Sequence, residues 1–168
     1  MRLSTATSMT SRKGQIPAII WWTDYLILAL WGQELSGGLD FLSPGVLVCL
    51  QSGQWWTALW MAAAWVLVQE GGGNLVFGVS IVFYAGMLVF YLISRWLLEP
   101  ENPLFIIFFS LLLACWSWGV VSGAINFQEL PPRSHSPLPW ITKQWVAYVV
   151  FWGGALFVYR RGGRDGRI

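Results

Sequence analysis

The segment that decides the fold is WMAAAWVLVQEGGGNLVFGVS, residues 60–80. Two apolar stretches meet there at one acid, Glu70, and three glycines, Gly71, Gly72 and Gly73. Because glycine allows positive φ and close backbone approach, we expect a bend that joins two hydrophobic helices. The carboxylate either caps this hairpin or, together with the exposed loop, meets a partner or a substrate.

Apolar residues on both sides of this bend run on for about 20 residues at a time, the length a helix needs to span roughly 30 Å of hydrocarbon. Of all residues, 56% are hydrophobic and only 11% are charged, against roughly 25% charged in soluble proteins. The chain is also Trp-rich, and several of its 13 tryptophans fall near the expected span ends, where the ring suits the headgroup region. Since helices satisfy their own backbone hydrogen bonds in lipid, the sequence predicts an all-α polytopic bundle within the lipid bilayer.

The expected organisation is a single transmembrane helical domain, residues 16–159, between two basic tails, residues 1–15 and 160–168. We expect about six spans, at residues 16–35, 41–51, 55–69, 75–98, 104–125 and 138–159. The second helix is short, with a rise of only about 16 Å at 1.5 Å per residue, so it is expected to be tilted, re-entrant or in a locally thin region of the bilayer. Its break from the third helix is placed near Gly53.

The basic residues predict the orientation of the bundle. With six spans, most of the ten Lys and Arg residues fall on the side of the two termini. These are Arg2, Arg12, Lys13, Arg95, Arg160, Arg161, Arg164 and Arg167. Since basic residues near span ends are retained in the cytoplasm, both tails are expected to be cytoplasmic.

One carboxylate, Asp24, lies near the middle of the first expected span, where it costs roughly 2.5–3.5 kcal/mol on insertion scales. Lys143, about one turn into the last expected span, is the partner that we expect for it. Two alternatives are a role in proton or ion coupling and a position close enough to the interface to stay hydrated.

Small residues recur every four positions in the fifth expected span, at Cys115, Gly119 and Gly123. Such a face lets two helix backbones approach closely in lipid, where no hydrophobic effect brings helices together. We expect this face to pack within the bundle, and dimerisation is the alternative.

Motifs of known enzyme classes are absent from the sequence. His135 is the only histidine, and one histidine cannot build a multi-histidine zinc site. Ser122 has no convincing base on a facing helix, and the three glycines are not followed by the Lys of a phosphate-binding loop. We therefore expect a protein that is not an enzyme, with no catalytic residues, metal, cofactor or nucleic-acid partner.

The order of these features resembles the rod shape-determining protein MreD family. The matching residues are Pro44, which opens a short second helix (PGVLVCLQ), the acid that ends WMAAAWVLVQE, the glycine-rich bend, and NLVFG at the start of the fourth helix. Glu70 takes the place of the family's Asp, and Gly78 that of its helix-opening glycine.

This resemblance implies a non-enzymatic scaffold in the bacterial inner membrane. It would belong to the cell-elongation machinery that determines rod shape and positions peptidoglycan synthesis. Its partners would be other membrane and periplasmic proteins of that complex.

The same family is similar in plan to the substrate-binding membrane subunits of vitamin uptake transporters, which implies an alternative function. A small molecule would then occupy an outward pocket lined by the bend after the third helix and by the loop at residues 126–137. Glu70, Arg133 and nearby tryptophans would contact it.

Overall fold

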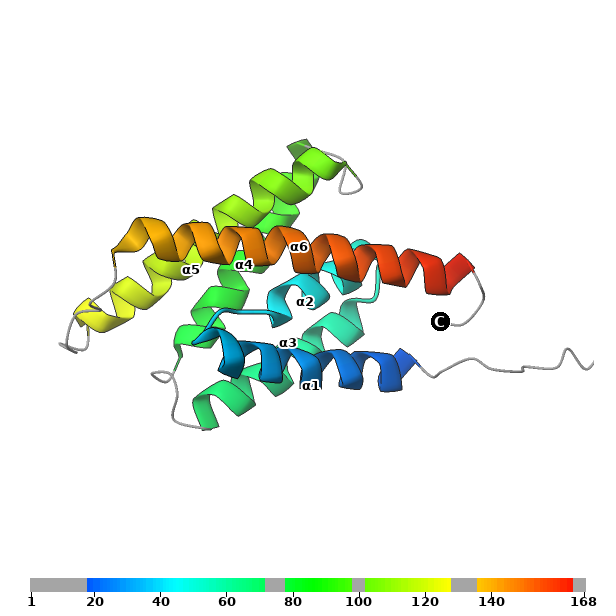
Figure 1. The fold of residues 1–168 in the computed structure, drawn as a ribbon, viewed down its shortest axis with the longest axis horizontal. Helices are drawn as coiled ribbons and strands as arrows, with labels where there is room; N and C mark the ends of the chain where they lie inside the picture. Colours follow the sequence, from blue (N-terminus) through cyan, green and yellow to red (C-terminus); the bar gives the residue numbers. More distant parts are fainter. Residues whose placement is uncertain (1–17, 72–77, 98–101, 128–135, 165–168) are drawn as a thin grey trace, which may run out of the picture.

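The computed structural model describes residues 18–71, 78–97, 102–127 and 136–164, which contain six α-helices and no strand (Figure 1). The helices are α1 (Ala18–Ser36), α2 (Leu42–Gln51), α3 (Trp55–Gly71), α4 (Val79–Leu97), α5 (Pro103–Phe127) and α6 (Pro137–Arg164). The prediction of an all-α bundle with a short second helix is confirmed.

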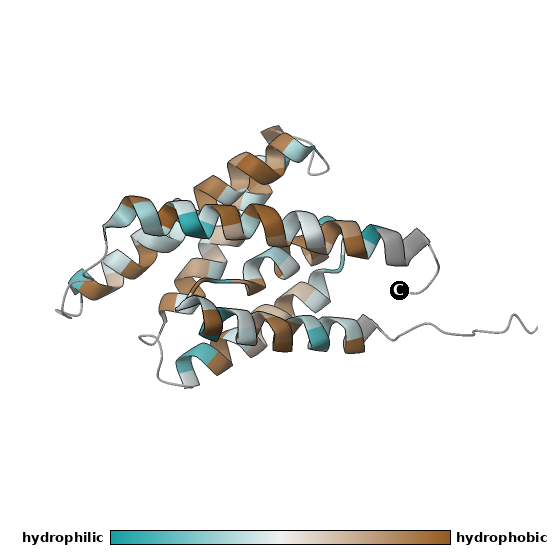
Figure 2. Cartoon of the chain, in the orientation of Figure 1, coloured by the Kyte–Doolittle hydropathy of each residue, from teal (hydrophilic) through white to brown (hydrophobic). Residues whose placement is uncertain are grey.

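Three of these helices are long and apolar enough to cross a membrane: α4, α5 and the part of α6 up to Arg160. Large apolar side chains such as Val89, Phe108 and Phe157 are exposed on their outer surfaces, and apolar residues run along the whole length of the bundle (Figure 2). In water, so much exposed apolar surface would be unfavourable. The outer surface therefore suits contact with lipid.

Consecutive helices run in broadly opposite directions, so α1 begins at the end of the bundle where α6 ends (Figure 1). The rings of Trp22 in α1 and Tyr159 in α6 have their centroids 6.1 Å apart there. We call this the terminal end. The opposite end, where α1, α3 and α5 end and α4 and α6 begin, is called the distal end. The six-span plan predicts this placement of the first and last helices at one end.

The central element of the bundle is α2. Its ten residues rise only about 15 Å, half of the hydrocarbon thickness. Every residue from Phe41 to Leu50 is buried, and α2 contacts α1, α3 and α6. The predicted break after it is confirmed at Gly53, whose φ of +74° is a left-handed conformation that favours glycine.

Two glycines allow bulky aromatic rings to lie against a neighbouring helix. A Cβ added to Gly45 of α2 would lie 2.2 Å from the ring of Tyr25 in α1, and one added to Gly86 of α4 would lie 2.4 Å from the ring of Trp116 in α5. The Tyr25 hydroxyl then donates a hydrogen bond to the carbonyl of Phe41 at 2.8 Å. Close approach within the bundle therefore occurs at these two glycines.

The small-residue face of α5 does not pack within the described bundle, contrary to our expectation. Cys115 is exposed, and a Cβ added at Gly119 or Gly123 would have no neighbour within 4 Å. The reason is that α5 buries its aromatic face instead, with Phe105 and Phe109 against Trp152 of α6. Dimerisation through the small-residue face stays a prediction.

A polar cavity at the distal end of the bundle

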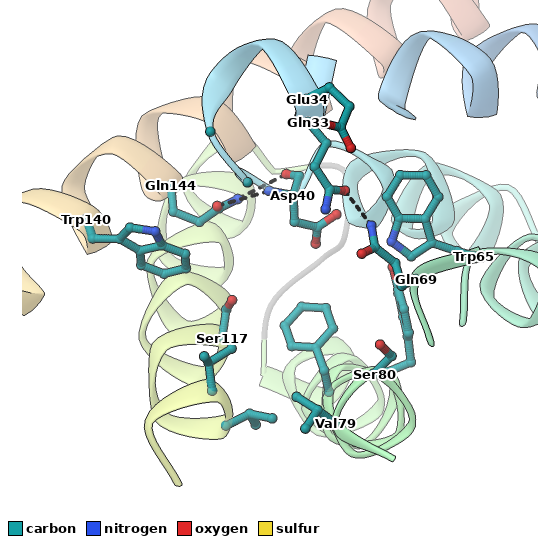
Figure 3. A pocket seen from close by; sticks show the side chains of 16 residues that line it. Gln33, Glu34, Asp40, Trp65, Gln69, Val79, Ser80, Ser117, Trp140 and Gln144 are labelled. Atoms are coloured by element: carbon teal, nitrogen blue, oxygen red, sulfur yellow. Dashed lines mark hydrogen bonds between the residues drawn. The ribbon is translucent and has the colours of Figure 1, made fainter. Parts of the chain in front are cut away.

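A cavity of about 330 Å³ lies at the distal end, within the range of small-molecule sites, roughly 300–1,000 Å³. It lies among the last turns of α1 and α3, the connection from α1 to α2, the first turns of α4 and α6, and the second half of α5 (Figure 3). Its polar lining residues are Gln33, Glu34, Asp40, Gln69, Ser80, Tyr84, Ser117, Trp140 and Gln144. We call it the distal cavity.

The cavity follows from the short length of α2, which does not reach the distal end. Asp40, which caps α2, is hydrogen-bonded to Gln144 and Tyr148 of α6. These two residues lie about 10–16 Å along α6 from its first residue, Pro137. The connection from α1 turns at Gly37 and Gly38, whose φ angles of +73° and +96° favour glycine. Space therefore remains between the first turn of α2 and the distal end.

Asp40 forms the floor of this cavity and caps α2. Its Oδ1 accepts hydrogen bonds from the backbone N–H groups of Leu42 at 2.9 Å and Ser43 at 3.2 Å. Its Oδ2 accepts one from the hydroxyl of Tyr148 at 2.9 Å, and another from the hydroxyl of Ser43. A carboxylate at a helix N-terminus is also stabilised by the helix dipole. Asp40 can therefore remain within an apolar bundle.

The backbone of Asp40 is fixed by Gln144, whose side chain is fully buried in α6. The Gln144 Oε1 accepts a hydrogen bond from the Asp40 N–H at 3.1 Å, and its Nε2 donates one to the Asp40 carbonyl at 3.0 Å. Because both ends of the amide are engaged, the cavity floor is held against α6 with a defined geometry.

Two buried polar atoms in the cavity wall have no hydrogen-bond partner in the described part of the chain. Gln69 is 4% exposed and Ser80 is 5% exposed. The Gln69 Nε2 donates to Oε1 of Gln33 at 2.7 Å, but Oε1 of Gln69 and the hydroxyl of Ser80 are unpartnered, and both residues face the cavity (Figure 3). Leaving such a group unpaired costs about 1–3 kcal/mol. Water or a ligand in the cavity can satisfy both.

Glu70, the acid of the predicted bend, lies at the end of α3 immediately after Gln69. Its Oε1 accepts a hydrogen bond from the N–H of Gly78 at 3.0 Å, which favours the capping interpretation because the bond closes the bend from α3 to α4. Gly71 is exposed. Gly72, Gly73 and Arg133 lie outside the described residues.

The predicted pair of Asp24 and Lys143 is not formed: both side chains are exposed, and no ion pair joins them in the described structure. Asp24 lies near Trp22 at the terminal end, whereas Lys143 lies about 24 Å along α6 from Tyr159, the residue that contacts Trp22. The prediction was wrong because it paired these residues only on the ground that both are charged and both fall within expected spans. In the structure, α1 and α6 place them at opposite ends of the bundle. The carboxylate held in the interior is Asp40.

The expected spans at residues 16–35 and 41–51 left Asp40 in the connection between them, and neither Gln69 nor Gln144 was identified from the sequence. For Asp40 a signal was available, because Asp is a preferred N-cap residue and Pro44 follows within the first helical turn. The glutamines carried a weaker signal, since polar residues within spans usually face the bundle interior.

Comparison with protein-family models, with curated proteins and with solved structures finds no match. The fold and the cavity nevertheless define a class: an all-α bundle with helices apolar enough to span a membrane and a polar cavity at one end.

Proposed function

We propose that this protein binds a small polar molecule in the distal cavity, as the substrate-binding membrane subunit of an uptake transporter. The observation that carries this proposal is the pair of unpartnered polar atoms, Gln69 Oε1 and Ser80 Oγ, in the cavity wall. Apolar residues of similar size at these positions would avoid the cost of unpaired polar groups. A ligand that pairs with them gives a reason for their presence.

The distribution of charge supports an outward-facing cavity. Arg160 lies exposed at the terminal end, and Arg95 lies exposed in the last turn of α4. The sequence before α1 and after α6 is also rich in Lys and Arg. Since basic residues near span ends are retained in the cytoplasm, the distal end would face the outside of the inner membrane. A cavity on that side suits uptake.

The test is whether a small molecule is retained through purification. We expect native mass spectrometry of the protein in lipid nanodiscs to detect a bound molecule, which a bulky residue inside the cavity would displace. Ser117→Trp places such a residue in the cavity wall. Leu112→Trp, on the exposed side of the same helix, is the matched control.

Loss of the molecule in Ser117→Trp, with retention in the wild type and in Leu112→Trp, supports the proposal, as does co-purification of an energising ATPase. If Ser117→Trp retains the molecule, or if no molecule is found in any of the three proteins, the proposal fails. If Ser117→Trp does not fold, Val121→Phe fills the same cavity with a smaller change.

A second candidate is the scaffold role in the rod-shape machinery, and the hydrogen bond between Glu70 and Gly78 favours it. These two residues take the places of the Asp and the helix-opening Gly of the MreD family. The hydrogen bond of 3.0 Å joins these two residues directly, so the part of the chain that carries the resemblance is one structural unit at the distal end. In this candidate the bend between α3 and α4 contacts other proteins of the elongation complex.

The scaffold candidate predicts cell rounding on depletion and co-purification with peptidoglycan-elongation proteins. Glu70→Ala removes the acceptor for the Gly78 N–H and should weaken this association, whereas Glu70→Gln keeps an acceptor oxygen and should retain most of it. If Glu70→Ala and a shortened glycine bend both leave complex assembly intact, the bend is only a turn.

A further inference from the structure

We infer that the ligand of the distal cavity is a small organic cation with N–H donors, a protonated amine on an apolar or aromatic body. This inference rests on the proposed binding function and names its ligand class.

The charge of the cavity lining is the first observation. Glu34 and Asp40 both line the cavity, and none of the 16 described lining residues is Lys or Arg. The nearby Lys143 lines a separate apolar groove, between α6 and the connection from α1 to α2. Two carboxylates without a neighbouring basic side chain in the lining favour a cation and oppose an anion.

The unpartnered atoms are the second observation. Gln69 Oε1 is buried and can only accept a hydrogen bond, and the hydroxyl of Ser80 can also accept one. A ligand that satisfies Gln69 Oε1 must supply a donor, and an ammonium group can donate to Gln69 and Ser80 at once. Hydrogen bonds from a charged donor are shorter and stronger than neutral ones.

Aromatic rings are the third observation. Trp65, Phe83, Tyr84 and Trp140 line the same cavity, and the rings of Phe83 and Tyr84 meet edge to face with centroids 5.2 Å apart. Aromatic faces attract organic cations, and they also pack against the apolar body of such a ligand. Negative charge, acceptors and rings therefore select the same class of molecule.

The inference is tested by calorimetric titration of the nanodisc protein at pH 7 with three probes of similar size. These are 2-phenylethylamine, which is a cation, 2-phenylethanol, which is neutral, and 3-phenylpropanoate, which is an anion. We expect the amine to bind at least about tenfold more tightly than either other probe, as one charge-assisted hydrogen bond predicts.

Two variants locate the amine. Gln69→Met removes the unpartnered acceptor and should weaken amine binding by about 10- to 100-fold. Gln54→Met is the matched control, because it removes a helix-bridging glutamine at the terminal end, outside the cavity, and should leave the affinity unchanged. Glu34→Gln, an exposed substitution that does not threaten folding, should weaken binding about two- to fivefold, and more at low salt.

The possible failures are distinguishable. If the alcohol or the anion binds as tightly as the amine, or if Gln69→Met and Glu34→Gln both bind the amine like the wild type, the cation class is wrong and the binding function stands. If no probe binds, the charge of the molecule retained through purification tests the inference. A cationic molecule supports it, and an anionic or neutral molecule overturns it. If none of the nanodisc proteins retains a molecule, the proposed function itself fails.

Discussion

The two ends of the bundle use the same side chain, glutamine, in different ways. At the terminal end Gln54 accepts a hydrogen bond from Nε1 of Trp22 at 3.3 Å and donates one to the hydroxyl of Tyr159 at 3.0 Å. At the distal end Gln69 donates to Gln33, and its own Oε1 is unpartnered beside a cavity. The Gln54 amide therefore links three segments of the chain, whereas the Gln69 amide keeps an acceptor that a ligand can use.

The difference follows from where α2 lies along the bundle. At its C-terminal end, Oε1 of Gln51 accepts a hydrogen bond at 3.0 Å from Nε1 of Trp152, which lies near the middle of α6. At its N-terminal end α2 stops at Asp40, and the distal cavity lies beyond this residue. In an apolar bundle, therefore, the presence of a polar residue says less about its role than whether its hydrogen-bonding groups are paired.

The largest expected effect is at the cavity floor. Asp40→Ala removes the acceptor of two backbone N–H groups and of the Tyr148 hydroxyl, so we expect the free energy of unfolding to fall by about 3 kcal/mol. Asp40→Asn keeps one acceptor oxygen and should lose about 1 kcal/mol. Denaturant unfolding in detergent, followed by tryptophan fluorescence, measures both. Equal losses would mean that the hydrogen bonds of the carboxylate do not hold the floor.

A direct test of the comparison is the pair Gln54→Met and Gln69→Met. The first leaves the N–H of the buried Trp22 and the hydroxyl of Tyr159 unpaired, so it should cost about 2 kcal/mol of unfolding free energy. The second breaks one hydrogen bond but also removes an unpartnered acceptor, so it should cost less than about 1 kcal/mol. If the two costs are equal, the ends of the bundle do not differ in the way described.

Serine offers a matched pair with a smaller effect. Ser80 and Ser110 are both buried with unpartnered hydroxyls, but only Ser80 lines the distal cavity. Either change to Ala should stabilise the ligand-free protein by up to about 1 kcal/mol in thermal unfolding, and only Ser80→Ala should weaken the binding of 2-phenylethylamine. Equal effects of both variants on binding would remove Ser80 from the site.

Much of this fold was predictable because run length and glycine placement are local signals. The short second helix, the break at Gly53 and the bend after Glu70 were all available from such signals. The side of α5 that faces inward was not, because a helix that is apolar all round carries no periodic signal for its rotation. Packing of Phe105 and Phe109 against Trp152 sets that rotation and leaves Cys115 outside.

The cavity was harder to predict because its contacts are remote in sequence. Asp40 and Gln144 are joined by two hydrogen bonds across 104 positions, and no local pattern specifies that register. Charge alone was a poor guide, since it selected Asp24, which is exposed, and passed over Asp40.

The smallest expected effect concerns the charges Asp24 and Lys143, which lie at opposite ends. Because both side chains are exposed, Asp24→Asn and Lys143→Gln should each change the free energy of unfolding by less than about 0.5 kcal/mol. Residues so far apart should also act independently, so the double variant should equal the sum of the two single variants. A coupling above about 0.5 kcal/mol in this double-mutant cycle would mean that the two charges meet after all.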